Sequence, residues 1–167
     1  MTPIFAIDPG NRESAWCVYY PDTHTLGSFG KDKNSVVRQV LIDSRQWEHH
    51  YAIEMIASYG MPVGADVFNT CLWAGRFLEV IERSGHSAEL VYRKAVKLEL
   101  CGTHKAKDSN IRQSILDRFP ATGGGAVPQQ GTKAAPGPLY GVSKDVWAAL
   151  AVALTYHAKQ QELERAA

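Results

Sequence analysis

The pattern of apolar and polar positions near the N-terminus predicts a hairpin. Residues 3–7 and 14–20 form two apolar runs of strand length, separated at 8–10 by a turn that carries a proline and a glycine. Because proline and glycine favour turns, the two runs predict antiparallel strands. A third run over 25–30 extends the hairpin to a three-stranded meander. Asp8 then ends the first strand, where the apolar pattern does not require a carboxylate.

Helix-type and strand-type patterns alternate in the rest of the chain. Apolar spacing predicts strands at about 50–57 and 89–92 and helices at about 34–47, 65–83, 93–100, 105–119 and 144–165, the last with Ser143 as its N-cap. The residues expected to face the core in the first two helices are Val36, Val37, Val40 and Leu41, then Val67, Phe68, Cys71, Leu72, Phe77, Leu78 and Ile81. A meander followed by alternating helices and strands predicts an α/β fold around a mixed sheet. At 167 residues, the chain is expected to form one domain.

Composition is that of a globular protein, with 45% hydrophobic and 21% charged residues and a net charge of +1. No apolar run approaches the ~20 residues that span a membrane, and no secretory signal is visible. The three cysteines are expected to be reduced thiols in a cytoplasmic protein. Cys101 and His104 have zinc-like spacing, but no second pair lies nearby, so we treat this spacing as chance.

Two segments bear on nucleic-acid binding. Residues 93–133 contain eight basic and three acidic residues, a local net charge of +5 that suits either a phosphate-binding surface or a solvated face. Residues 120–139 are rich in glycine and proline and form a connection of unusual length. This loop could become ordered on a phosphate backbone, through Lys133 among others, but its composition alone favours flexibility or disorder.

Three carboxylates stand at positions where a functional role competes with a structural one. Asp8 ends a strand, Glu54 interrupts an apolar strand, and Asp145 lies at the start of the last helix. Each has a structural alternative: a turn cap for Asp8, a solvent-facing position on an edge strand for Glu54, and the helix dipole for Asp145. An unpaired carboxylate inside a buried strand is costly, so Glu54 is informative after Asp8.

If the last helix packs across the sheet, its first turn brings Asp145 beside Asp8 and Glu54. Clustered carboxylates repel one another unless cations are present, and hard oxygen ligands favour Mg²⁺ or Mn²⁺. Two such ions about 4 Å apart suit in-line attack of water on a phosphodiester. Lys105 and Lys107 are nearby basic residues whose positive charge could bind substrate phosphates or stabilise negative charge that develops during the reaction.

The order of these elements resembles a known family. The segments Ala6-Ile7-Asp8-Pro9-Gly10, Ala52-Ile53-Glu54 and 145–154 resemble the RuvC family of Holliday-junction resolvases, which belongs to the ribonuclease H-like superfamily. Gly131-Thr132-Lys133 and residues 136–141 are most similar to its phage-encoded branch. The resemblance covers nearly the whole chain and depends on the order and spacing of all the segments together.

The resemblance implies a ribonuclease H-like fold, with a mixed five-stranded sheet flanked by helices. It also implies a Mg²⁺-dependent endonuclease that nicks branched DNA as a homodimer, in the cytoplasm of a bacterium or a phage-infected host. Asp8, Glu54 and Asp145 match three family acids, but Ala148 stands where the bacterial enzymes carry an aspartate. Either Asp145 serves there alone, or Asp108 supplies the fourth ligand, or metal binding is weakened.

The resemblance leaves other site residues open. A catalytically important lysine of the family corresponds to Lys105 or Lys107. The family also carries an aromatic wedge after the glutamate strand, for which Tyr59 and Phe68 are the nearest candidates, because Ala57 occupies the strict position. Candidate DNA contacts are Tyr59, Arg112 and Lys133.

Three other functions are considered. The chain could be another ribonuclease H-like nuclease that cuts RNA·DNA hybrids or processes RNA. Ala148 motivates an inactive protein that only binds junctions. Sugar-kinase and actin-like ATPases also begin with a strand, an aspartate and a glycine turn, but they need two such domains, and 167 residues without an internal repeat are too few.

Overall fold

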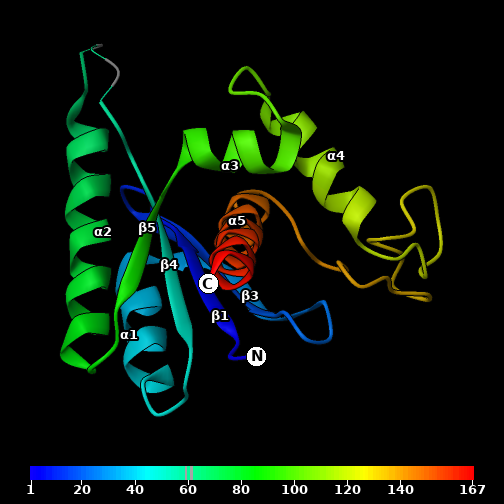
Figure 1. Ribbon diagram of the computed structural model, residues 1–167, viewed down its shortest axis with the longest axis horizontal. Coiled ribbons are helices and arrows are strands. Elements are labelled where there is room, and N and C mark those ends of the chain that lie inside the picture. The colour runs from blue at the N-terminus through cyan, green and yellow to red at the C-terminus, as the bar shows by residue number, and fades with distance from the viewer. Residues whose placement is uncertain (59, 61) are drawn as a thin grey trace.

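The computed structural model describes residues 1–58, 60 and 62–167. Its five-stranded sheet has the order β3-β2-β1-β4-β5, and both antiparallel pairs precede the parallel ones along the chain (Figure 1). The strands are β1 (Ile4–Asp8), β2 (Glu13–Tyr20), β3 (Thr25–Lys33), β4 (His50–Met55) and β5 (Ala88–Tyr92). The predicted mixed sheet, a meander followed by parallel strands, is confirmed.

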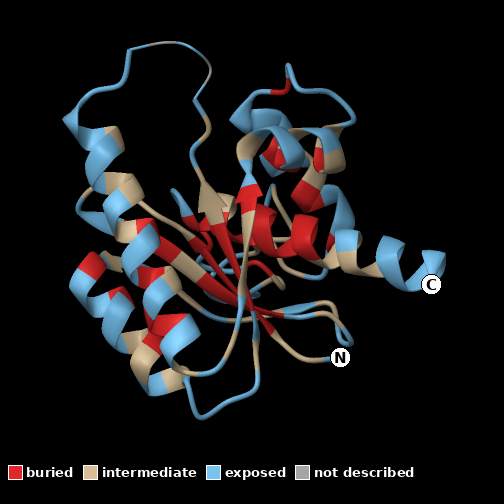
Figure 2. Cartoon of the chain, turned by 60° about the vertical axis from the view of Figure 1, so that its left-hand side comes forward, coloured by how far each residue is buried: buried red, intermediate tan, exposed pale blue. Residues whose placement is uncertain are grey.

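Helices cover both faces of this sheet. They are α1 (Asn34–Ser44), α2 (Ala65–Arg83), α3 (Arg93–Cys101), α4 (Asp108–Arg118) and α5 (Val146–Ala166). Helices α1 and α2 pack on one face, whereas α5, with α3 and α4 beyond it, packs on the other (Figure 1). In Figure 2, buried residues concentrate on the strands and on the helix faces turned toward them.

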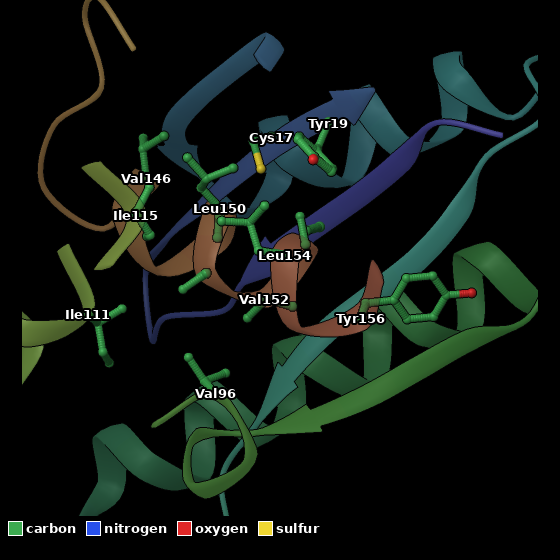
Figure 3. Close-up of a cluster of buried hydrophobic side chains, with 14 of the residues drawn as sticks. Cys17, Tyr19, Val96, Ile111, Ile115, Val146, Leu150, Val152, Leu154 and Tyr156 are labelled. Carbon is green, nitrogen blue, oxygen red and sulfur yellow. The ribbon is translucent and has the colours of Figure 1, made fainter. Parts of the chain in front are cut away.

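The alternation of side chains along β1 divides the core into two clusters. Phe5 and Ile7 belong to the cluster under α1 and α2, and Ile4 and Ala6 to the cluster under α5. This division follows from the two-residue period of a strand, which makes successive side chains point to opposite faces. Figure 3 shows the second cluster, in which side chains of α5 meet those of the strands and of α3 and α4.

Small side chains allow α5 to approach the sheet closely. Ala6 and Ala52 on the strands and Ala149 and Ala153 on α5 are all fully buried in one cluster. The alanines of α5 therefore pack against the sheet. This close packing fixes the start of α5 relative to the ends of β1 and β4.

The start of α5 differs from the prediction. Ser143 is not the N-cap, because the helix begins at Val146 and its N-cap residue is Asp145. Lys144 has a positive φ of 50°, which a residue of a right-handed helix does not adopt. Helix α4 likewise begins at Asp108 rather than near residue 105.

Parts of the predicted core stripes are exposed. Val37 and Leu41 of α1 are buried, but Val36 is 45% exposed. On α2, Phe77 and Ile81 are buried, whereas Phe68 and Leu72 are 64% and 53% exposed. The apolar period continues beyond the end of the sheet surface, so the N-terminal half of α2 has little to pack against.

The glycine- and proline-rich segment 120–139 folds back on itself through backbone hydrogen bonds. Gly123 N–H donates to Pro128 O at 2.8 Å, and Gly137 N–H donates to Gln130 O at 3.0 Å. A Cβ on Gly123 would lie 2.6 Å from the Cα of Gly131, so two stretches of backbone meet where side chains do not fit. The composition favoured disorder, but here glycine serves close backbone packing.

Candidate active site

Asp8 is held by the turn that follows β1. Ser14 Oγ accepts from Gly10 N–H at 3.1 Å and donates to Asn34 Oδ1 at 2.6 Å. Asn34 Nδ2 in turn donates to Gly10 O at 2.9 Å. A Cβ on Gly10 would lie 2.2 Å from Glu13 O, so this tight turn requires glycine. Ser14 and Asn34 are both buried, and together they fix where the strand delivers its carboxylate.

Glu54 lies beside Asp8 because β4 runs parallel to β1. Ile7 pairs with Ile53, so the next residue of each strand carries one of the two carboxylates. Since β4 lies between β1 and β5, Glu54 is not on an edge strand, and that alternative is wrong. The Glu54 side chain is only 12% exposed.

The ends of these strands open into a cavity of about 310 Å³. The cavity brings together the four predicted acids with an arginine, a lysine and the first turn of α5. Its lining residues are Asp8, Glu54, Arg93, Asp108, Ile111, Lys144, Asp145, Trp147 and Ala148. Side chains from β1, β4, α4 and α5 thus converge as the sequence predicted.

Burial and mutual repulsion perturb the strand carboxyls. Burial, reinforced by the charge of Glu54 and by a hydrogen bond with it, raises the pKa of Asp8 to about 8, and Asp145 adds a smaller repulsion. Burial also raises the pKa of Glu54, while the Arg93 guanidinium opposes that rise. Asp8 and Glu54 therefore share a proton near neutral pH unless a cation replaces it.

Basic side chains engage the other carboxylates. Arg93 lies 3.4 Å from Glu54 Oε1 and also pairs with Asp108. Lys31 Nζ donates to Asp145 Oδ2 at 2.5 Å. Three of the four acids in the cavity are thus paired with a basic group.

Neither Arg93 nor Lys31 was predicted as a site residue, because the position of each relative to the acids follows from which strands are neighbours. Arg93 directly follows β5, whose carboxyl end lies beside that of β4. Lys31 pairs with Ala15, which pairs with Asp8, so Lys31 belongs to the same cross-strand row.

The donor set fits a hard divalent cation in charge and ligand type. Two buried carboxyls that cannot both ionise freely, with two further carboxylates at the rim, are the oxygen ligands that Mg²⁺ and Mn²⁺ prefer. As the side chains stand, however, no three His, Cys, Asp or Glu residues within the described ranges are grouped closely enough to hold a metal ion. In this arrangement Arg93 and Lys31 form ion pairs with Glu54, Asp108 and Asp145.

The other predicted residues that the structure describes do not line this cavity. Lys105 and Lys107 are exposed before and at the N-cap of α4, and neither lines the acidic cavity. Lys133 is exposed on the segment 120–139. Arg112 lines a neighbouring cavity, and Tyr59 lies outside the described residues.

Two further observations concern metals and membranes. Cys101 and His104 join no three-residue ligand group in the described part of the chain, and Cys17, Cys71 and Cys101 form no disulfide. None of the described helices is both long and apolar enough to cross a membrane.

The sequence matches no protein-family model, and no curated protein matches it. Solved structures do match over nearly the full length. RuvC of Thermus thermophilus has a TM-score of 0.64 at 17% identity, over 96% of this chain and 97% of that chain. T. thermophilus RuvC in complex with a Holliday junction substrate has a TM-score of 0.66 at 18% identity, over 94% of this chain and 93% of that one.

At this identity the likeness shows the fold alone. The chain has the ribonuclease H-like fold of RuvC, with the same mixed five-stranded sheet and flanking helices, as the sequence predicted. A shared fold does not assign functional roles to residues, so the roles of the site residues rest on the geometry of the cavity.

Proposed function

We propose that this protein is a metal-dependent endonuclease that resolves Holliday junctions and other branched DNA by phosphodiester hydrolysis. The observation that carries the proposal is the buried Asp8–Glu54 pair, which opens into a cavity with Asp145 and Asp108. This pair lies at the carboxyl ends of two adjacent parallel strands, in a fold shared with a protein solved on a Holliday junction.

Asp8, Glu54 and Asp145, with Asp108 in place of an acid at Ala148, would hold two Mg²⁺ or Mn²⁺ ions. When bound, the metal would supply activation of water and neutralisation of the leaving oxygen. In the hydrolysis, a water oxygen loses a proton and adds to phosphorus, the bond from phosphorus to one sugar oxygen breaks, and that sugar oxygen takes up a proton to leave as a hydroxyl group.

The protein's own residues position the acids and neutralise the negative charge of the substrate. The turn at Gly10 fixes Asp8, and α5 brings Asp145 beside it. Arg93 and Lys144 place positive charge in the acidic cavity, where a phosphodiester needs neutralisation. Lys105 and Lys107 remain candidates for contacts with flanking phosphates, and Lys133 could contact DNA further from the cut.

The proposal also covers the oligomeric state, the aromatic wedge and the branch of the family. The chain acts as a homodimer, so that two sites nick opposite strands, and each copy forms one nuclease domain. Phe68, exposed on α2, is the described candidate for the aromatic wedge, with Tyr59 as the other. The motifs at 131–133 and 136–141 support membership of the phage-encoded branch, and with it action in the cytoplasm of a bacterium or a phage-infected host.

The test is cleavage of an end-labelled four-way junction against a matched linear duplex and an RNA·DNA hybrid. We expect paired nicks in the junction with Mg²⁺ or Mn²⁺ and none with a chelator. Preferential cutting of the hybrid would retain the metal site and change the substrate. Absence of cleavage of all three substrates in both metals would overturn the proposal that the protein is a nuclease.

A second candidate is a protein that binds junctions without cutting them. Two observations favour it: Ala148 lacks the family's acid, and Arg93 and Lys31 already pair with three of the four carboxylates. Tight junction binding with no cleavage in either metal would support this function.

A further inference from the structure

A second and larger cavity adjoins the acidic one. It has a volume of about 770 Å³ and shares Asp108, Lys144 and Trp147 with the acidic cavity, so the two have common walls. Its other walls come from α4 and from the folded segment after it, chiefly Arg112, Leu116, Val127, Gln130 and Val142. The proposed cleavage reaction leaves this space without a role.

Arg112 lies over the ring of Trp147 in this cavity. The Arg112 guanidinium carbon lies 5.0 Å from the centre of the Trp147 ring. Gln130 Oε1 accepts from Arg112 at 2.7 Å, while Gln130 Nε2 donates to Val142 O at 2.9 Å. Arg112 is therefore fixed between an aromatic ring and the segment 127–142, and its guanidinium is a preorganised flat surface.

The folding of segment 120–139 builds this wall. Leu139 N–H donates to Gln129 O at 2.8 Å, and Leu139 is fully buried. Val127 packs against the same core cluster. The apolar side chains at 116, 127 and 142, with the ring of Trp147, make a lining that suits a planar apolar group better than a phosphate.

We propose that this cavity receives an unpaired nucleobase of the DNA strand whose phosphate lies in the acidic cavity, and that the base stacks on the Trp147–Arg112 pair. The inference rests on the proposed function, because the adjoining acids define which strand is bound. A base that leaves its pair at the branch point, where stacking is interrupted, offers a free face and a free pairing edge, whereas a base inside continuous duplex is paired and stacked on both sides. The cavity thereby favours branch points over continuous duplex.

Photo-crosslinking tests this directly and does not depend on cleavage. Four-way junctions carrying 5-iodouracil at successive positions around the branch point are bound in a chelator, irradiated and mapped by mass spectrometry. We expect one position to crosslink to Trp147, and the same base within linear duplex to give little product. Trp147→Leu should remove the crosslink and weaken junction binding about 5- to 50-fold, and Trp147→Phe should largely restore binding.

Matched variants separate this site from general charge or folding effects. Arg112→Gln should weaken junction binding, whereas Arg118→Gln, on the same helix but outside the cavity, should not. Trp47→Leu, an exposed tryptophan elsewhere, controls for loss of an aromatic ring.

The possible outcomes separate the two proposals. Crosslinks that map away from Trp147, or equal crosslinking in linear duplex, would overturn the base-binding cavity. Binding that depends equally on Arg118 would do the same. Cleavage without a Trp147 crosslink would retain the nuclease alone, and a Trp147 crosslink without cleavage would retain the cavity alone.

Discussion

The four acids of the cavity form two contrasting pairs. Asp8 and Glu54 stand on adjacent parallel strands, where Asp8 pairs with Ala15 of β2 and Glu54 with Val91 of β5. Asp145 and Asp108 stand at the starts of helices, and their side chains are 52% and 81% exposed. The strand pair is buried and repels itself, whereas the helix pair is solvated and held by Lys31 and Arg93.

The difference shows that the unfavourable electrostatic free energy of the site is concentrated at the buried strand pair. Two carboxylates in a low-dielectric region need a cation or a proton, because each raises the free energy of the other's charged form. Exposed carboxylates are solvated by water, and their ion pairs contribute little to the free energy of unfolding. The strand pair should therefore dominate metal binding and catalysis, with the helix pair adjusting both.

The largest expected effect follows substitution of the strand pair. Asp8→Asn should reduce junction cleavage by about 10³-fold or more, because it removes a charged ligand at the centre of the site. Asp117→Asn, on an exposed part of α4, is the matched control and should cut normally. Single-turnover cleavage measures both, and substantial activity of Asp8→Asn would contradict the ranking.

Substitution of the helix pair should have a smaller effect. We expect Asp145→Asn to lower cleavage about 10- to 100-fold and Asp108→Asn by less, since both are exposed and can be replaced in part by water. The same assay, repeated over a range of Mn²⁺ concentrations, should show partial rescue for these two variants and none for Asp8→Asn. Equal losses for Asp145→Asn and Asp8→Asn would erase the distinction between the pairs.

The strand pair also predicts how stability depends on pH. Folding raises the pKa of Asp8 from its ordinary 3.8 to about 8, so the folded state binds more protons than the unfolded chain between these values. The metal-free protein should therefore lose about 5 kcal/mol of unfolding free energy as pH rises from about 4 to 8, since a difference of one in pKa corresponds to about 1.4 kcal/mol. Asp8→Asn should lack most of that loss in urea unfolding, and a parallel decline in this variant would assign it to other groups.

The smallest effects should come from the two basic partners. Arg93→Met leaves Glu54, only 12% exposed, without its cation and should cost about 1–3 kcal/mol near pH 7. Lys31→Met removes a pair whose side chains are 30% and 52% exposed and should cost less than about 1 kcal/mol. Urea unfolding compares the two variants, and a larger cost for Lys31→Met would contradict the burial argument.

The strand acids could be predicted because their signal is local. A carboxylate that ends or interrupts an apolar strand is visible in the sequence, and parallel strands bring such residues to one edge of a sheet. Arg93 and Lys31 were missed because their importance depends on which strands are neighbours. The register that puts Lys31, Ala15 and Asp8 in one row is a property of the assembled sheet.

The segment 120–139 shows a different limit. As part of a glycine-rich composition, Gly123 and Gly131 favour disorder. In the structure, however, their backbones are in contact, which only glycine permits. Composition does not distinguish a glycine that loosens a chain from one that allows close contact. The wall of the larger cavity, including Val127 and Gln130, was therefore beyond sequence reasoning.

Calorimetric titration of Mn²⁺ into the wild-type protein and Asp8→Asn, without DNA, tests the central claim most directly. If the buried Asp8–Glu54 pair is the metal-holding centre, wild type binds Mn²⁺, with affinity increasing as pH rises toward 8 because bound carboxyls must lose their protons. Asp8→Asn should then show no binding at that site. Equal, pH-independent binding by both proteins would contradict the account.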